Sequence, residues 1–294
     1  MKPQSFPSPS PASVNLRAIG LLMIVGVVTA CWLALNFVFP DFDGIRSVVT
    51  RLIIHAVILT GLWLGLSRTD FSVATRVTVW LAIAIPFTLW LAVIWRLSFI
   101  GFFRPIPGST GVPALPIAIF TPVLIGLLLL MRSKRVAALL DATPPSWLVG
   151  IQVYRVFGGI FLVNWVRGSI PGIFALPAGT GDVLVGLLAL PVALYMSSGT
   201  SSGRTAGIAW NLLGLTDFAI AITMGALSSP GRLHVLSLSH PNVQIGTYPT
   251  VMIPAFGVPS SIILHVLSLW QLRRFARKAH ETQLKSYGSE PLAV

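Results

Sequence analysis

Long apolar stretches separated by short polar loops occupy most of the chain. Most of the stretches are near the ~20 residues that an α-helix needs to cross the hydrocarbon core of a bilayer. Eight can be traced, at residues 17–39, 51–67, 76–97, 113–131, 147–166, 172–195, 205–227 and 247–271. The pattern predicts an all-α integral membrane protein, a polytopic bundle of about eight transmembrane helices.

The composition favours the same class of protein. Hydrophobic residues make up 54% of the chain and charged residues 10%, against about 25% charged residues in a typical soluble domain. The net charge of +12 does not indicate nucleic-acid binding, because the sequence contains no compact basic domain. The lipid bilayer is therefore the expected partner. The single cysteine, Cys31, excludes an intrachain disulfide and a metal site built from several thiolates.

The two ends of the chain differ from its apolar middle. Residues 1–16 alternate Pro with Ser and predict a disordered cytoplasmic tail. Residues 272–294 are rich in Arg and Lys and predict a basic cytoplasmic tail. The expected transmembrane domain is thus 17–271.

A faint internal repeat suggests two parallel four-helix halves, 17–143 and 146–271. The fourth span carries Phe120–Pro122 and ends in a basic residue, and the eighth carries Phe256–Pro259 and does the same. Parallel repeats of this kind occur in transporters. Chance similarity between apolar segments explains the match equally well.

The distribution of Lys and Arg predicts the orientation. With both termini inside, thirteen Lys and Arg residues lie on the cytoplasmic side and six outside. Cytoplasmic loops carry the excess of positive charge, so we expect a multi-pass protein of the bacterial inner membrane with both termini cytoplasmic. The six residues placed outside are Arg46, Arg51, Arg96, Arg104, Arg167 and Arg232.

Three charged residues, Arg155, Asp182 and Asp217, lie deep inside apolar stretches. A charge at this depth is costly unless it is paired or solvated, so it marks a candidate functional site. At about 1.5 Å per residue, these three and His55 lie roughly 13–20 Å from the cytoplasmic end and can meet near the midplane. The remaining residues expected to line this centre are Tyr154, Asn211 and His265.

Small residues accompany the charged ones at helical spacing. Gly214 lies one turn from Asp217, and Gly186 one turn from Asp182. Small residues permit close approach of membrane helices, so the polar residues are expected to face the bundle interior and not the lipid.

The charge balance carries the functional prediction. Two aspartates face one arginine, so one carboxylate lacks a fixed cationic partner and must be protonated, pair with His55 or neutralise a bound cation. Proton-coupled carriers use groups poised in this way. The alternative is a static ion pair that fixes the register of the helices.

Helix-breaking residues predict irregular backbone in the same half. Pro177–Gly181 combine a missing donor with low helix propensity, so the sixth span is expected to be interrupted there. The eighth span is expected to be irregular as well, because it contains Pro249, Pro254, Gly257 and Pro259. Discontinuous membrane helices often mark binding sites.

No metal or cofactor is expected. His55 and His265 differ by about 9 Å in expected depth, and neither belongs to an HExxH motif. The sequence also has no GxSxG nucleophile motif and no lysine within a span.

We therefore expect binding or transport of an unknown small solute, coupled to protons, in place of catalysis. The open alternatives are an intramembrane enzyme acting on a lipid or isoprenoid substrate and a non-catalytic scaffold or subunit. Solvent accessibility of Asp217 separates them, since an open polar cavity favours transport or catalysis and a dry, sealed pair favours the scaffold. The oligomeric state is not predicted by the sequence.

Overall fold

The computed structural model describes residues 11–108 and 114–288, with side chains for 15–108 and 114–281. These ranges are helical and contain no strand. The elements in chain order are α1 (Pro11–Val38), η1 (Pro40–Phe42), α2 (Asp43–Leu66), α3 (Val73–Phe99), α4 (Ala114–Arg132), α5 (Lys134–Ala142), α6 (Pro145–Gly150), η2 (Ile151–Gly159), α7 (Ile160–Val166), α8 (Gly172–Met196), α9 (Ser201–Ser228), η3 (Gln244–Gly246), η4 (Ile253–Gly257) and α10 (Val258–Gly288).

Eight helical segments of the described residues are long and apolar enough to cross a membrane, which confirms the predicted all-α fold and the predicted number of candidate spans. They are Asn15–Val38, Pro40–Leu66, Val73–Phe99, Ala114–Arg132, Pro145–Val166, Gly172–Met196, Ser201–Ser228 and Ile253–Glu281. The second segment begins eleven residues before its expected start at 51. The predicted division into two parallel halves stays a prediction.

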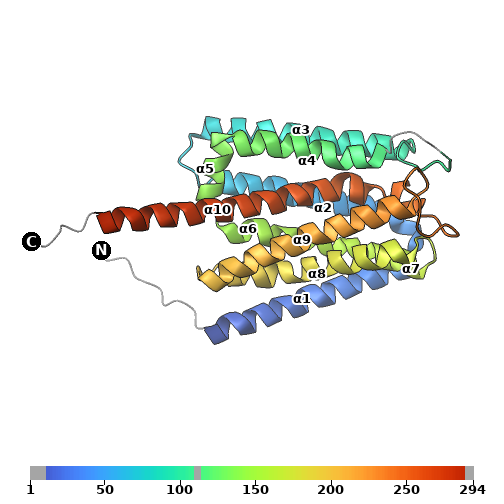
Figure 1. Cartoon of the computed structure of the whole chain (residues 1–294), viewed down its shortest axis with the longest axis horizontal. Coiled ribbons are helices and arrows are strands. Elements are labelled where there is room, and N and C mark those ends of the chain that lie inside the picture. Colours follow the sequence, from blue (N-terminus) through green and yellow to red (C-terminus); the bar gives the residue numbers. More distant parts are fainter. Residues whose placement is uncertain (1–10, 109–113, 289–294) are drawn as a thin grey trace, which may run out of the picture.

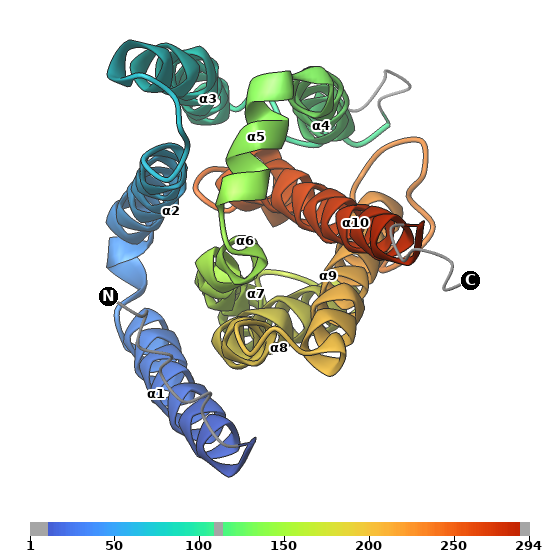
Figure 2. The same ribbon diagram turned by 90° about the vertical axis from the view of Figure 1, so that its left-hand side faces the viewer.

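The long helices run nearly side by side, with α1 beginning and α10 ending at the same end of the bundle (Figure 1). We call this the terminal end, and the opposite end, formed by the connections α1–α2, α3–α4, α7–α8 and α9–α10, the loop end. The short helix α5 lies across the terminal end (Figures 1 and 2). Both described ends of the chain therefore lie on one side, as an even number of spans requires.

Helix α8 is the centre of the second half, where it packs against η2, α9, α1, α6 and α7. Glycines allow these close approaches. A Cβ added at Gly179 would lie 2.7 Å from the Cγ of Leu162, and one at Gly186 would lie 2.7 Å from Cγ1 of Val156. The polar residues of these elements are thereby brought within hydrogen-bonding reach.

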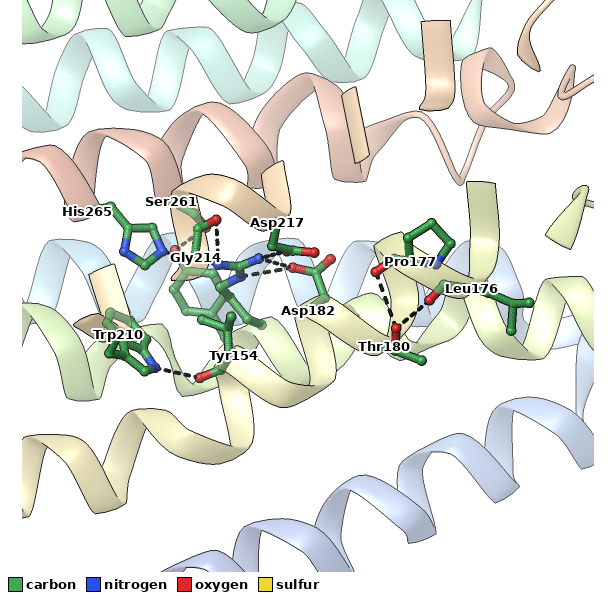
Figure 3. Close-up of polar contacts among 12 residues, drawn as sticks. Tyr154, Leu176, Pro177, Thr180, Asp182, Trp210, Gly214, Asp217, Ser261 and His265 are labelled. Carbon is green, nitrogen blue, oxygen red and sulfur yellow. Dashed lines mark hydrogen bonds and ion pairs between the residues drawn. The ribbon is translucent and has the colours of Figure 1, made fainter. Parts of the chain in front are cut away.

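The prediction that the sixth span breaks near Pro177–Gly181 is wrong, because α8 is one continuous α-helix that includes this stretch. Pro177 lacks only the N–H that would bond to the carbonyl of Ile173, four residues earlier. One turn further along, Thr180 donates from Oγ1 to the carbonyl of Leu176 at 2.6 Å and to that of Pro177 at 3.4 Å (Figure 3). One lost bond near the start of a long helix does not end it.

Backbone irregularity occurs instead in the fifth span and at the start of the eighth. Residues Ile151–Gly159 form a 3₁₀-helix, and Ile253–Gly257 form a π-helix, as expected for an irregular eighth span. Such segments often mark functional sites when they interrupt α-helices. The first carries Tyr154 and Arg155 of the polar centre described below, and Gly257 of the second lies close to Arg51.

The expected tails are partly helical. Helix α1 begins at Pro11, so it includes the last six residues of the predicted disordered segment 1–16, and residues 1–10 lie outside the described residues. Helix α10 continues to Gly288, so most of the predicted basic tail 272–294 extends the last span.

Candidate functional site in the second half of the bundle

The guanidinium group of Arg155 binds both aspartates, as predicted. Its Nε donates to Oδ1 of Asp182 at 2.9 Å, and its Nη2 lies 2.7 Å from the same oxygen. Nη2 also donates to Oδ2 of Asp217. Figure 3 shows the two carboxylates, from α8 and α9, converging on one group. The ring of Phe218 covers the guanidinium, with its centroid 3.9 Å from Cζ. We call Arg155, Asp182 and Asp217 the ion triad.

The 3₁₀ geometry of η2 positions Arg155. With about three residues per turn, residues three apart lie above one another, so Gln152, Arg155 and Gly158 share one face. All three are buried. The arginine side chain thus leaves a tightly packed surface and extends toward α8 and α9.

Glycines shape the pocket for the two carboxylates. A Cβ at Gly158 would overlap Oδ2 of Asp182, and one at Gly181 would overlap Oδ1 of Asp217. These are the carboxylate oxygens that Arg155 does not bind, and they accept no hydrogen bond from the described residues. Each carboxylate therefore keeps one oxygen on which a proton could reside.

His265 accepts a hydrogen bond from Arg155, with 3.1 Å between Nε2 and Nη1. Its Nδ1 lies 2.9 Å from Oδ1 of Asn211, whose amide nitrogen donates to the carbonyl of Gly207. Because arginine only donates and a carbonyl oxygen only accepts, the imidazole carries its single proton on Nδ1. His265 is thus neutral, and its protonation would place an N–H against the N–H of Arg155.

A chain of polar contacts leads from the ion triad toward the terminal end. Asn211 bridges to Ser268, with its Nδ2 donating to Oγ at 3.0 Å. On the other side of the centre, the hydroxyl groups of Tyr154 and Ser261 lie 2.9 Å apart. Ser261, His265 and Ser268 are buried at helical spacing on α10, so His265 faces the bundle interior, as expected. Except for His55, the predicted site residues lie in the ion triad, in this chain of contacts or, as Tyr154 does, in the separate hydroxyl pair.

His55 does not join the ion triad, contrary to expectation. Its Nε2 lies 2.9 Å from the hydroxyl of Thr88, and its ring stacks on Phe87 with centroids 5.1 Å apart. Both partners belong to α3. The imidazole satisfies its polar and apolar contacts there, and His265 occupies the place beside Arg155 that His55 was expected to take.

A second buried arginine, Arg51, escaped the sequence analysis, which placed it in an outer loop. It is 4% exposed because α2 begins at Asp43, two turns before it. The sequence predicted that the single arginine pairs with one aspartate and that the other carboxylate lacks a fixed cationic partner. The structure shows instead that the guanidinium of Arg155 contacts both carboxylates.

The ion triad is sealed in this conformation. Asp217 is 7% exposed and Asp182 8%. A separate apolar cavity of about 1140 Å³ is lined mainly by residues of α2, α3, α4, α5, α6, α8 and α10, including Pro86, Trp90 and Pro122, but by none of the three charged residues. In the part of the chain that the structure describes, no group of three or more His, Cys, Asp or Glu side chains could hold a metal ion.

A comparison with protein families matches residues 112–273 to a family described as a domain of unknown function (DUF8737). The matched segment contains the ion triad and the other members of its network, whereas Arg51 and His55 precede it. No curated protein and no solved structure matches the chain. Since the matched segment covers more than half of the chain, the protein belongs to the DUF8737 family.

Proposed function

We propose that the protein binds and carries a small solute across the membrane, coupled to proton binding at the ion triad. Asp217 and Asp182 are the proton-binding carboxylates and Arg155 is their counter-ion. Tyr154, Asn211 and His265 line the path. The observation that carries this proposal is the shared guanidinium: two carboxylates compete for one group at the centre of an apolar bundle.

Protonation of one carboxylate changes the helix contacts around it. Arg155 joins η2 to α8 through Asp182 and to α9 through Asp217. A proton on Asp217 removes the ionic part of the second link, since the neutral acid binds a guanidinium more weakly. Helix α9 can then move relative to η2, while Asp182 keeps the arginine paired. Coupling between proton and solute follows from such a two-state contact.

Burial of the ion triad also suits a scaffold, in which a sealed pair fixes helix register. The feature that favours a carrier is the continuation of the polar network beyond the pair. His265, Asn211 and Ser268 extend it toward the terminal end. A register-fixing pair requires no such extension, and each buried polar group in it adds a desolvation cost.

A second candidate function is binding of a lipid or isoprenoid, which the apolar cavity of about 1140 Å³ favours. Its volume is at the upper end of ligand pockets, roughly 300–1,000 Å³. Trp90 lines it and holds an indole N–H without an acceptor among the side chains described. The carboxylates do not line this cavity, so the arrangement supports lipid binding more than lipid chemistry.

The proposed location is the bacterial inner membrane with both termini cytoplasmic. Removing buried Arg51 from the outer residues leaves five Lys and Arg residues there against thirteen inside, which strengthens the positive-inside argument. A reporter that is active only outside the cytoplasm, fused to Val294, is expected to stay inactive. Strong activity of that fusion would reverse the orientation.

The proposed function is tested by untargeted metabolite comparison of cells that lack the protein, make it, or make the Asp217→Asn or Asp182→Asn variant at equal membrane levels. We expect the protein to change the level of at least one small solute and at least one of the two variants to abolish that change. Asp141→Asn is the matched control, because Asp141 lies on α5, away from the ion triad. If both triad variants reproduce the wild-type profile, the centre is structural and the scaffold function replaces the carrier.

A further inference from the structure

Arg51 is buried as deeply as Arg155 but has almost no hydrogen-bond partners. Its Nη2 lies 3.5 Å from the hydroxyl of Thr50, at the limit of a hydrogen bond. Its Nε–H has no acceptor in the described part of the chain, and no carboxylate lies within salt-bridge distance of it there. A buried guanidinium with unmet donors is costly and points to a ligand that supplies acceptors.

A small polar cavity adjoins this side chain at the loop end. Its volume is about 40 Å³, and its wall is formed by α1, α2, α7, η2 and the segment that precedes α10. Besides Arg51, the polar residues of the wall are Asn36, Asp43, Arg46, Ser47, Thr50, Asn164 and Thr250. A water needs roughly 10–15 Å³ of such space, so the cavity can hold a group of about three heavy atoms.

The charges around the cavity favour an anion. Asp43 is the carboxylate of the wall, and it is already paired with Arg46 and lies 3.8 Å from Arg167. Arg51 therefore contributes an uncompensated positive charge to the wall. The π-helix also leaves room for its guanidinium, because a Cβ at Gly257 would lie 3.1 Å from Nη1.

We propose that Arg51 binds a small anion in this cavity, with a carboxylate group as the preferred ligand. A planar guanidinium matches a carboxylate in a two-point contact, and the amide groups of Asn36 and Asn164 lie in the same wall. Asn36 donates one of its two amide hydrogens to the carbonyl of Trp32, which leaves the second for a ligand. The cavity volume suits a carboxylate group better than a tetrahedral phosphate. The site is formed by α1 and α2 together with elements of the second half.

This inference rests on the proposed function. It identifies the cavity as the binding site of the transported solute and a small carboxylate as the substrate class. The cavity wall includes Phe157 of η2, the element that also carries Arg155. An anion bound in the cavity therefore contacts the same element that holds the two carboxylates, and a shift of η2 would change both sites. Anion and proton binding are then reciprocal, as in a carrier that moves the two together.

The test uses the purified full-length protein in detergent micelles, with thermal unfolding followed by tryptophan fluorescence. Formate, acetate and phosphate are titrated at constant ionic strength. Each replaces gluconate, a background anion that is too large for the cavity. Acetamide serves as the neutral analogue of acetate. A ligand that binds only the folded state raises the Tm with concentration. We expect formate or acetate to raise the Tm and acetamide to leave it unchanged.

Arg51→Gln is expected to abolish this rise, and Arg104→Gln to retain it. Arg104 is exposed near the loop end and does not line the cavity. Arg104→Gln therefore removes the same positive charge as Arg51→Gln but leaves the cavity unchanged. Gly257→Ala is a second variant, which keeps Arg51 but reduces the space around its guanidinium. It should require several times more anion than wild type for the same rise in Tm. An equal rise in wild type and Arg51→Gln, or no rise in wild type with any anion, would overturn the proposal.

The outcomes separate this inference from the proposed function. If no anion binds but Asp217→Asn still abolishes the metabolite change, the anion site fails and the carrier stands. If an anion binds at Arg51 but both triad variants behave as wild type, the anion site stands and proton coupling at the triad fails.

Discussion

Arg155 and Arg51 are buried to 3% and 4% exposure, yet their surroundings are opposite. Arg155 donates hydrogen bonds to two carboxylates and to a neutral imidazole, and it lies against an aromatic ring. Arg51 has one long contact to a hydroxyl group and faces a cavity. The comparison teaches that burial alone does not assign a role to a membrane arginine. The number of acceptors around it does.

The two environments predict different responses to substitution. Removing Arg155 leaves two carboxylates without their direct counter-ion in a low-dielectric interior. Removing Arg51 takes away a charge whose donors are mostly unmet. A group that is held by satisfied partners stabilises the contacts among its helices in this conformation, whereas a group whose donors are unmet is available to a ligand.

Arg155→Ala is expected to produce the largest effect. Breaking a buried pair by removing one partner costs about 3–5 kcal/mol, and here one arginine serves two aspartates. The free energy of unfolding in mixed micelles, measured against wild type, checks this. Combining Arg155→Ala with Asp182→Asn and Asp217→Asn should recover part of the loss, because no carboxylate is then stranded. A loss below about 1 kcal/mol, the range of exposed ion pairs, would place the triad in contact with water.

Gly158→Ala is expected to follow, with a loss of about 1–3 kcal/mol, the usual cost of overpacking. Its Cβ would overlap the carboxylate of Asp182, whereas the Cβ in Gly257→Ala would meet only Nη1 of Arg51, at 3.1 Å. The pair therefore compares the packing around the two arginines. Gly26→Ala is the matched control, since nothing lies within 4 Å of its Cβ, and it should not destabilise the protein. Equal losses of stability for Gly158→Ala and Gly257→Ala would contradict the expectation that the surroundings of Arg155 are packed more tightly than those of Arg51.

Arg51→Met should change the free energy of unfolding by no more than about 1 kcal/mol, the centre of the range for single substitutions, because it breaks no satisfied hydrogen-bond network. The methionine keeps the long side chain and removes the unmet donors. The measurement is the same micelle unfolding assay, performed without added anions. A loss as large as that of Arg155→Ala would show that Arg51 serves the fold through Asp182, and would remove the contrast between the two arginines.

The ion triad followed from the sequence because three charges in apolar stretches have few ways to be satisfied. Helical spacing then gave the inward faces of α8, α9 and α10. Arg51 was missed because the nearby charges of Asp41, Asp43 and Arg46 resembled a loop, and the span was started at the arginine itself. Ile45, Val48 and Val49 continue the apolar pattern toward the chain start and would have revealed the longer helix.

Backbone irregularity was less predictable for a physical reason. Proline content indicates where a donor is missing, but neighbouring hydroxyl groups and tertiary packing decide whether the helix yields. Helix α8 stays continuous through Pro177, whereas η2 adopts 3₁₀ geometry without any proline, from Ile151 to Gly159. The close approach of Gly186 to the backbone of Val156 is a tertiary contact that no local sequence pattern encodes.

A third arginine, Arg274, extends the comparison to the surface and gives the smallest expected effect. It contacts Asp141 of α5 at 2.6 Å through Nη2, and Lys278 lies 2.8 Å from the same carboxylate. Hydrogen bonding to Arg274 is the main reason that the pKa of Asp141 lies below its usual 3.8. Asp141→Asn should therefore destabilise the protein by only about 0.2–1 kcal/mol, as for exposed pairs.

The pH dependence of that loss has a defined sign. Because the folded-state pKa of Asp141 is lowered, its contribution to stability is present above the unfolded value of 3.8 and is lost as the pH falls through the folded value. The free energies of unfolding of wild type and Asp141→Asn should differ by a constant amount from about pH 5, roughly one pH unit above the unfolded pKa of 3.8, up to about pH 7. The two free energies should converge as the pH falls below 3.8. High salt should reduce the difference, because exposed charges are screened. No measurable difference between the two proteins at pH 7 would mean that α5 is held across the terminal end by Gln271, whose Nε2 donates to the carbonyls of Leu140 and Thr143 at 2.6 Å, and not by the ion pair.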